Sequence, residues 1–182
     1  MKRFWWVGML WLVTSGAQAR DFHGVRMPDA VTISGKQAKL NGMGLRRKFV
    51  FDVYVAGFYV ETPSTDPAKL IASDEVKRIT MMMLRDLGKD KIVDALREGF
   101  EKNSKDRMPA LKDRLDQLAA MIPDAKKNGT IVITYVPGDG TTLSTSGERS
   151  VIPGKDFADA LFSVWLGPAP VDDDLKKGLL GG

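Results

Sequence analysis

Alternation of apolar and polar side chains dominates the first part of the chain and predicts β-structure. Residues 31–34 and 37–41 flank Gly35-Lys36, a two-residue hairpin signal. Residues 49–60 carry aromatic and β-branched side chains at both odd and even positions, which predicts a central strand covered on both faces. Residues 76–84 predict another buried strand.

Further along the chain, apolar residues recur at the spacing of helices. Stripes of apolar residues three and four positions apart predict amphipathic helices that cover a sheet. The predicted helices are 66–71, 89–102, 109–122, 156–166 and a last one that starts near Asp172. Between them, residues 130–136, 141–146 and 149–152 predict an antiparallel meander. Strands, helices, strands and helices in this order indicate an α+β protein. No repeat or linker divides residues 20–182, so we expect one domain.

The N-terminus has the pattern of a secretory signal peptide. Lys2 and Arg3 precede an apolar run at residues 4–13, and Ala17-Gln18-Ala19 is a small-x-small cleavage signal. A membrane anchor would need roughly 20 apolar residues, which is longer than this run. We therefore expect cleavage after residue 19 and no transmembrane segment thereafter. The periplasm is the expected location if the cell is Gram-negative.

Composition excludes several classes of chemistry. The chain has no cysteine and one histidine, His23, which we expect at the surface. Thiolate nucleophiles, Cys-ligated zinc, histidine metal cages and histidine triads are therefore not expected, and the sequence predicts neither cofactor nor metal. The net charge is +4 and falls to +2 when Lys2 and Arg3 are removed. Acids and bases alternate without a basic stripe, so we expect no nucleic-acid partner.

Two local patterns have structural rather than chemical interpretations. Gly42-Met43-Gly44 lacks the third glycine of a dinucleotide fingerprint, because Arg47 stands in its place. The pair of glycines is more typical of a bulge or of a close approach to the backbone. Residues 172–174 are three aspartates without the spacing of a calcium loop, so they predict a helix N-terminus.

The most informative charges are Arg46, Arg47 and Lys48, between the glycines and the apolar strand. They can form a solvated hairpin turn. Alternatively, one arginine lies under the cover of the sheet, where its charge needs an anion. That anion can be Asp52 or an external carboxylate, which a guanidinium fork binds well and to which a phenol such as Tyr54 can also donate.

Three segments resemble the chalcone isomerase-like family, and with the order of the elements between them the resemblance extends over nearly all of the chain after residue 19. They are Leu-Asn-Gly-Met-Gly-Leu-Arg at 40–46, the strand at 51–60, and a closing helix with a Trp-Leu-Gly step and a Leu-Leu-Gly tail at 162–181. The resemblance implies an open-faced β-sandwich, in which a large antiparallel sheet packs against a layer of helices and encloses an apolar cleft. The leader resembles the exported bacterial branch.

The family's functional residues are matched only in part. Arg46 matches the cleft arginine that stabilises an oxyanion in the isomerases. Tyr54 stands where the isomerases have a threonine, which is similar to the fatty-acid-binding branch. The isomerases' helical Tyr-x-x-Lys-x-x-x-Asn pattern is absent from residues 89–102. Oxyanion stabilisation needs several donors aimed at one point, so the resemblance favours a non-catalytic member.

The leading hypothesis is an exported protein that binds a small amphipathic ligand such as a fatty acid. Arg46 and Tyr54 are expected at the acid group, and Phe58, Met81 and Met83 along the tail. A run of methionines is usually core, but its adaptable side chains also suit a ligand-binding wall. Two alternatives stay open: an isomerase or lipid-modifying enzyme that uses Arg46, and an accessory partner of an envelope protein.

Overall fold

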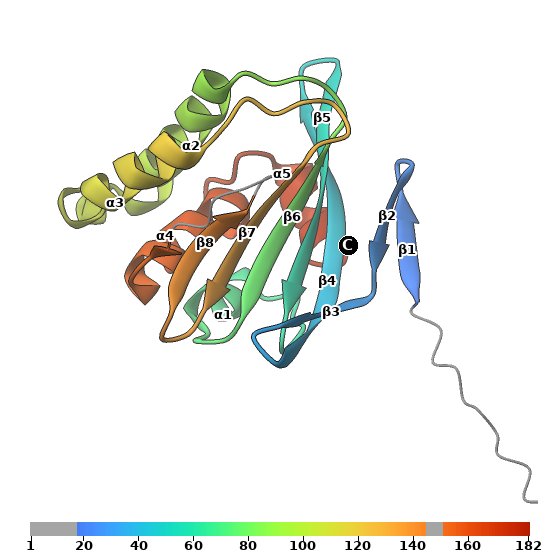
Figure 1. Ribbon diagram of the computed structural model, residues 1–182, viewed down its shortest axis with the longest axis horizontal. Helices are drawn as coiled ribbons and strands as arrows, with labels where there is room; N and C mark the ends of the chain where they lie inside the picture. Colours follow the sequence, from blue (N-terminus) through green and yellow to red (C-terminus); the bar gives the residue numbers. More distant parts are fainter. Residues whose placement is uncertain (1–17, 145–150) are drawn as a thin grey trace, which may run out of the picture.

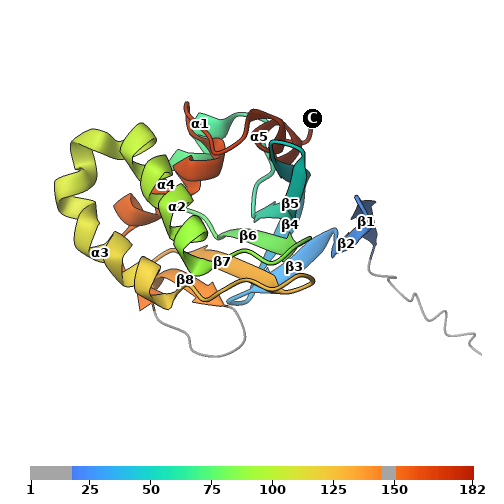
Figure 2. The same ribbon diagram turned by 90° about the horizontal axis from the view of Figure 1, so that it is seen from above.

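The computed structural model describes residues 18–144 and 151–182, and it has the predicted α+β architecture. Seven antiparallel strands form one sheet in the order β3-β4-β5-β6-β7-β8-β9, and a separate hairpin pairs β1 with β2. Helices lie on one face of the curled sheet, and the β1–β2 hairpin lies on the other side of the molecule (Figures 1 and 2). The expected helix layer over a large antiparallel sheet is therefore confirmed.

Most strands and helices lie where the periodicity predicts them, with exceptions at β1, β2 and β4 that are described below. The strands are β1 (Ala19–Phe22), β2 (Val25–Pro28), β3 (Ala30–Ile33), β4 (Lys36–Lys48), β5 (Phe51–Val60), β6 (Lys77–Met83), β7 (Thr130–Val136), β8 (Gly140–Ser144) and β9 (Val151–Ile152). The helices are α1 (Pro67–Ala72), α2 (Lys89–Ser104), the short 3-10 helix η1 (Lys105–Arg107), α3 (Met108–Met121), α4 (Lys155–Leu166) and α5 (Asp173–Leu179).

Strand β5 lies inside the sheet, between β4 and β6, and is covered on both faces as predicted. Its Tyr54 and Phe58 face the larger core under the helices. Its Val55 and Tyr59 face a second core. Two cores on opposite faces explain why apolar side chains occupy both odd and even positions of this strand.

The β1–β2 hairpin was not predicted, and it covers the second core. On β2, the side chains of Val25 and Met27 are buried in this core, and they alternate with the exposed Arg26 and Pro28. Met27 packs directly on Gly57 of β5, where a Cβ atom would collide with its sulfur. Exposed His23 and Gly24 form the turn of the hairpin, both with positive φ. Because each strand has only four residues, the alternation was too short to be recognised in the sequence.

Strand β4 is longer than predicted, and this corrects two boundaries. It continues through the glycines to Lys48, so Arg46 and Arg47 lie in the strand and not in a turn. The turn is formed instead by Phe49 and Val50, which were assigned to the next strand. Register shifts next to Gly42 and after Arg46 mark irregularities that bend the strand, so its residues do not follow simple alternation.

The two glycines of β4 allow α5 to lie against the strand. A Cβ atom at Gly42 would collide with the carbonyl oxygen of Gly178, and one at Gly44 would lie 2.6 Å from the carbonyl oxygen of Leu175. The expected close approach to the backbone is thus confirmed. It brings Asp172, the N-cap of α5, to the Arg46 end of β4.

Some predictions fall partly outside the described residues. Most of the expected signal peptide (1–17) lies there, as do residues 145–146 and 149–150 of the expected meander. Within the described ranges, no helix is long and apolar enough to cross a membrane.

Candidate functional site

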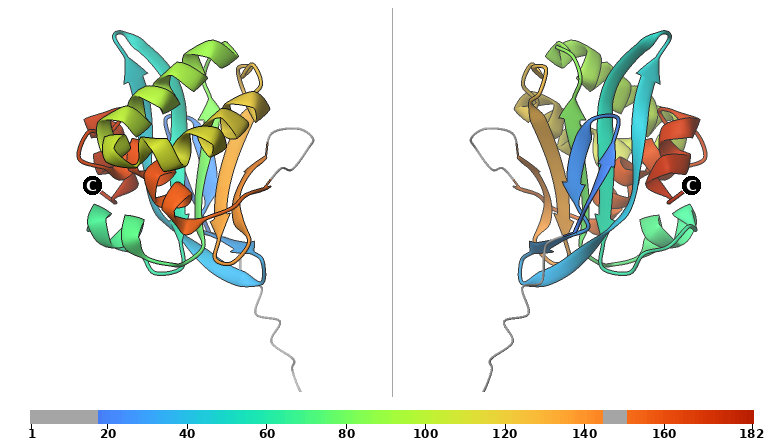
Figure 3. Two further views of the ribbon diagram at one scale, coloured as in Figure 1. Left: turned by 90° about the vertical axis from the view of Figure 1, so that its left-hand side faces the viewer. Right: turned by 90° about the vertical axis from the view of Figure 1, so that its right-hand side faces the viewer.

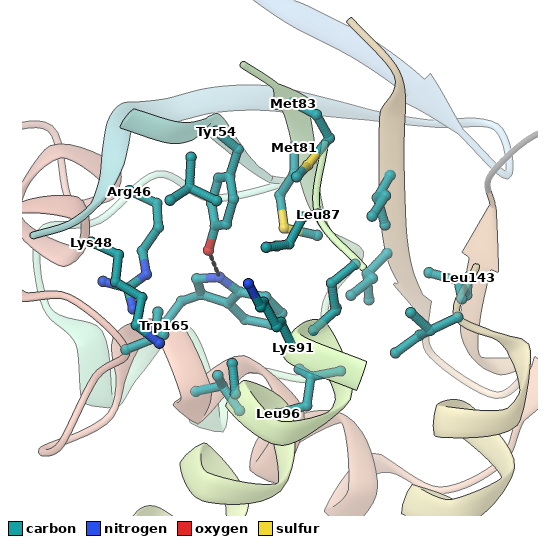
Figure 4. Close-up of a pocket in the computed structure, with 18 of the residues that line it drawn as sticks. Arg46, Lys48, Tyr54, Met81, Met83, Leu87, Lys91, Leu96, Leu143 and Trp165 are labelled. Carbon is teal, nitrogen blue, oxygen red and sulfur yellow. Dashed lines mark hydrogen bonds between the residues drawn. The ribbon is translucent and has the colours of Figure 1, made fainter. Parts of the chain in front are cut away.

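A cavity of about 110 Å³ lies between the sheet and helices α2 and α4, and its lining is mostly apolar. Strands β5 to β8 supply one wall and α2 and α4 supply the other. Figure 4 shows polar side chains gathered at one end, near Tyr54 and Trp165, while Leu143 lies towards the opposite end. The site therefore has a polar end and an apolar end.

Sheet register places three of the predicted site residues in one row. Arg46 on β4 is the cross-strand partner of Tyr54 on β5, and Tyr54 is the partner of Met83 on β6. All three line the cavity. The β4–β5 hairpin thus brings Arg46 and Tyr54 together, although they would lie roughly 26 Å apart on one straight strand.

Arg46, rather than Arg47, faces the cavity. The Arg46 side chain is only 17% exposed, and its Nη1 donates to Asp172 Oδ2 at 3.0 Å and to the Arg47 carbonyl oxygen at 2.9 Å. Arg47 is exposed, and its Nε pairs with Asp52 at 2.7 Å. Asp52, which the sequence offered as a partner for the cleft arginine, therefore serves the outer one. Within the described residues, Nε and Nη2 of Arg46 make no hydrogen bond.

Tyr54 is buried at the polar end, and Trp165 fixes the orientation of its hydroxyl. The indole Nε1 of Trp165 donates to the Tyr54 oxygen at 3.0 Å, a bond drawn in Figure 4. Burial raises the pKa of Tyr54 to about 12, against the lowering effects of this bond and of the Arg46 charge. The phenol is therefore neutral near pH 7. Its own proton has no acceptor among the described residues, so it remains available to a ligand.

The predicted tail contacts divide into two groups. Met81 and Met83 alternate on β6 and both line the cavity. Phe58 does not line it: this side chain lies deeper in the core, 5.8 Å from Phe162 between ring centroids. Met82 points to the opposite face and packs with the second core. The methionine run thus contributes two side chains to the cavity and one to the other side of the sheet.

Two cationic side chains at the polar end extend the site towards solvent. Lys48 and Lys91 line the cavity and, together with Arg46, also line an adjoining polar cavity of about 340 Å³. Asp94 and Glu98 of α2 also line that second cavity. The shared residues mark the mouth between the two spaces, so an anionic group at the polar end meets three cationic side chains, of which Arg46 is already paired with Asp172.

Sequence reasoning missed two residues of this site. Trp165 was assigned to the apolar stripe of its helix and to the Trp-Leu-Gly step, and neither pattern predicts a hydrogen bond to a residue 111 positions earlier. Lys91 of the predicted helix 89–102 was not considered as a site residue, although it lines the cavity. Only the position of α2 over β5 and β6 would have identified it.

The donors of this site can bind an anionic group. Arg46, Tyr54 and Lys91 are donors, and a neutral tyrosine with a raised pKa is a poor base. In the described part of the chain, no three His, Asp or Glu side chains gather in a way that would hold a metal ion. The arrangement can bind an acidic group at one end and apolar atoms at the other.

Comparisons with known proteins agree with the fold. A search of curated proteins finds no match. Among solved structures, a fatty-acid binding protein of Arabidopsis thaliana superposes with a TM-score of 0.69 and 15% sequence identity, over 90% of this chain and 96% of that chain. The family model described as chalcone isomerase-like matches residues 19–181. Since this match spans nearly the whole described chain, the protein belongs to the chalcone isomerase-like family.

Proposed function

We propose that this protein is a non-catalytic binding protein for a small amphipathic carboxylate such as a fatty acid. The observation that carries the proposal is the division of one cavity into a cationic end and an apolar end. The carboxylate lies at Arg46 and Tyr54, and the tail lies against Met81 and Met83. The Arabidopsis protein of similar fold is a fatty-acid binding protein, which supports this choice of ligand.

The polar end has donors that folding leaves unused. Arg46 keeps Nε and Nη2 for a second acceptor, because its bonds to Asp172 and to the backbone use Nη1. Tyr54 keeps its proton, because Trp165 occupies an acceptor position of the oxygen. A carboxylate accepts bonds at two oxygens, and charge-assisted bonds are the strongest available to it. The spare donors therefore match an acid better than an alcohol or an ester.

The apolar end limits the length of the tail that enters without adjustment. A cavity of about 150 Å³ accommodates benzene, so a space of about 110 Å³ holds a short apolar segment. Longer chains require Met81 and Met83 to move. Unbranched, three-bond side chains can do so at low cost. We therefore expect affinity to rise with chain length until the methionines can move no further.

Extraction of the purified protein tests the proposal. Organic extraction and mass spectrometry are expected to find an aliphatic acid at near-stoichiometric amounts in the wild type and little in Arg46→Ala. Arg47→Ala is the matched control, because Arg47 is the neighbouring, exposed arginine and is expected to retain the ligand. Calorimetric titration with fatty acids of increasing length and with the corresponding alcohols then measures the preference for the acid.

Two results would contradict the proposal. One is equal affinity for acid and alcohol, which would mean that Arg46 and Tyr54 do not bind the polar group. The other is saturable turnover of a chalcone that disappears in Arg46→Ala, which would identify an isomerase.

We further propose that the protein is exported and cleaved after Ala19. The support is the charged and apolar pattern of the leader, together with a family match that starts at residue 19. The mass of the protein recovered from the periplasm of a Gram-negative host is expected to correspond to residues 20–182. Recovery of the uncleaved chain from the membrane fraction would exclude this proposal.

A further inference from the structure

The β4–β5 hairpin ends in a group of exposed apolar side chains. Phe49 is 86% exposed, Val50 is 82% exposed and Phe51 is 52% exposed. Figure 3 shows that this hairpin projects beyond the rest of the molecule. We call Phe49, Val50 and Phe51 the apolar tip. In the described residues only Val151 is another large apolar side chain of comparable exposure, and it lies on β9 at 47%.

Folding does not account for the residue at the end of this hairpin. Phe49 has a φ of +57°, in the left-handed region that is costly for bulky side chains. Two-residue hairpin loops favour glycine, asparagine or aspartate at such a position. The phenyl ring is exposed, so it gains nothing from burial in return. A large apolar group held at a strained, projecting position is typical of a residue that binds something else.

Basic side chains surround the apolar tip. Arg47 and Lys48 immediately precede it, and the guanidinium of Arg85 lies 4.3 Å from the centroid of the Phe51 ring. Arg47 pairs with Asp52 and Glu98 of α2 interacts electrostatically with Lys48, whereas Arg85 has no ion pair among the described residues. Asp86, the other acid close to Arg85 in sequence, is engaged by Lys126 and by the backbone NH of Lys127. The border of the tip therefore carries excess positive charge.

The apolar tip is adjacent to the mouth of the ligand cavity. Lys48, the last residue of β4, lines both the apolar cavity and the polar cavity outside it. The next residue is Phe49. A surface that contacts the tip therefore also lies next to the opening through which a ligand would enter.

We propose that the apolar tip docks on an anionic lipid bilayer, with Phe49 and Val50 in the interface and Lys48 and Arg85 against the headgroups. Aromatic side chains with flanking basic residues have the chemistry of interfacial membrane anchors. A lipid surface fits better than a protein partner, because three residues on a projecting hairpin are far less than the roughly 20–30 residues that a stable protein interface buries on each side.

The docking itself does not depend on the proposed ligand, but together they have a functional consequence. With the tip in the bilayer, the mouth of the cavity faces the membrane. An amphipathic acid can then pass between bilayer and cavity without crossing water. The protein would be a carrier that loads or unloads at a membrane surface.

Vesicle sedimentation tests the proposal. The purified protein is expected to sediment with phosphatidylcholine vesicles that contain phosphatidylglycerol, and much less with phosphatidylcholine alone. The double variant Phe49→Ser/Val50→Ser is expected to lose at least tenfold in apparent affinity. Val151→Ser, a single apolar-to-serine change at an exposed position on β9, is the control and is expected to bind like the wild type. All forms carry the same N-terminus, so any contribution of the leader cancels.

Charge reversal provides a second, independent measurement. Arg85→Glu is expected to weaken binding to the anionic vesicles at least fivefold, since each basic residue near the surface contributes roughly fivefold. Lys39→Glu is the matched control, because this exposed lysine is on the same strand as Lys48 but roughly 30 Å away.

The outcomes separate docking from ligand binding. The double tip variant is expected to bind fatty acid in solution like the wild type, because its substituted residues do not line the cavity. Absence of sedimentation with anionic vesicles, or equal losses in the tip variant and in Val151→Ser, would overturn the docking proposal and leave the ligand proposal intact. A wild type that sediments but binds no acid would overturn only the latter.

Discussion

The larger core, under the helices, contains two buried tyrosines that each have a cation nearby, and they differ in which hydrogen-bonding groups remain unused. Tyr54 lies beside Arg46 at the end of the cavity, and Tyr135 lies beside Lys77 at the opposite end of the sheet. Lys77 is fully buried, and its Nζ lies 5.9 Å from the centroid of the Tyr135 ring. We call the first pair, with Trp165, the open group and the second the closed group.

In the closed group, Lys77 and Tyr135 each donate a hydrogen bond to an acceptor of the chain. Lys77 Nζ donates to the Ile71 carbonyl oxygen at 2.5 Å and lies 3.8 Å from Asp159 Oδ1. The Tyr135 hydroxyl donates to Asp74 at 2.7 Å. In the open group the corresponding hydroxyl accepts a bond and keeps its proton. The comparison shows that a buried tyrosine beside a cation does not by itself indicate a binding site. Hydrogen-bond donors that face a cavity and have no partner in the chain do indicate one.

The largest effect is expected when the closed group loses its cation. Lys77→Ala removes the partner of the Ile71 carbonyl oxygen and of Asp159 and leaves a cavity, at a cost of roughly 2–4 kcal/mol in the free energy of unfolding. Urea denaturation measures this loss. The folded variant should bind fatty acid like the wild type, and a specific loss of affinity would contradict the division into two groups.

The pH dependence of stability sharpens the comparison further. Burial lowers the pKa of Lys77 from 10.5 to about 8, against the opposing effect of Asp159. Between these two values the unfolded chain holds a proton that the folded chain has released, so Lys77 makes stability rise with pH, by at most ~1.4 kcal/mol per unit. The rise in stability begins near pH 8 and is complete above pH 10.5. Below about pH 8 Lys77 is protonated in both the folded and the unfolded chain, so it adds no pH dependence there.

Lys77→Met isolates this contribution. The difference in unfolding free energy between wild type and variant, measured by urea denaturation from pH 7 to 10, should grow in favour of the wild type as pH rises. The same tyrosines are present in both proteins, so their own titration cancels. A difference independent of pH would mean that Lys77 keeps its ordinary pKa.

Removal of each hydroxyl is a matched pair of changes. Tyr54→Phe and Tyr135→Phe should each cost about 1 kcal/mol in stability, since each breaks one buried hydrogen bond. Only Tyr54→Phe should weaken fatty-acid binding, by about tenfold, because only its proton is available to a carboxylate. Calorimetric titration of both variants decides the point, and equal affinities would remove Tyr54 from the proposed site.

The smallest effect concerns the apolar tip, which adjoins the open group alone. Phe49→Asn places a residue that tolerates positive φ at a strained position and should raise the free energy of unfolding by up to ~1 kcal/mol. For a chain of this length that corresponds to a melting temperature about 2–4 °C higher. The same variant should bind anionic vesicles less well. A less stable variant would show that the Phe49 ring contributes to folding after all.

Most of the fold could be predicted from sequence because period-two and helical patterns are local. Three features had strong signals in the local sequence. They are the strand with apolar residues on both faces, the glycines of β4 that lie against α5, and the N-cap Asp172. The β1–β2 hairpin and the end of β4 could not be predicted: short strands and an aromatic turn resemble other structures.

The candidate site likewise has residues that the sequence could predict and residues that it could not. The resemblance to the family pointed to Arg46 and Tyr54, the run of methionines on one strand pointed to Met81 and Met83, and the structure places all four around one cavity. It did not separate Phe58, which occupies the same face of β5 but lies deeper in the core. Trp165 and Lys91 depend on how helices distant in sequence lie over the sheet, and no local pattern contains that information.

The position of Trp165 beside the cavity makes its intrinsic fluorescence a probe of ligand binding. The chain has four tryptophans, at positions 5, 6, 11 and 165, and the first three belong to the expected leader. A protein that starts at residue 20 therefore fluoresces from a single indole, which is 3% exposed and bonded to Tyr54 beside the cavity. Entry of an apolar chain into the cavity changes the surroundings of that indole directly. Occupancy of the cavity can therefore be followed in the unlabelled protein by the wavelength and intensity of tryptophan fluorescence.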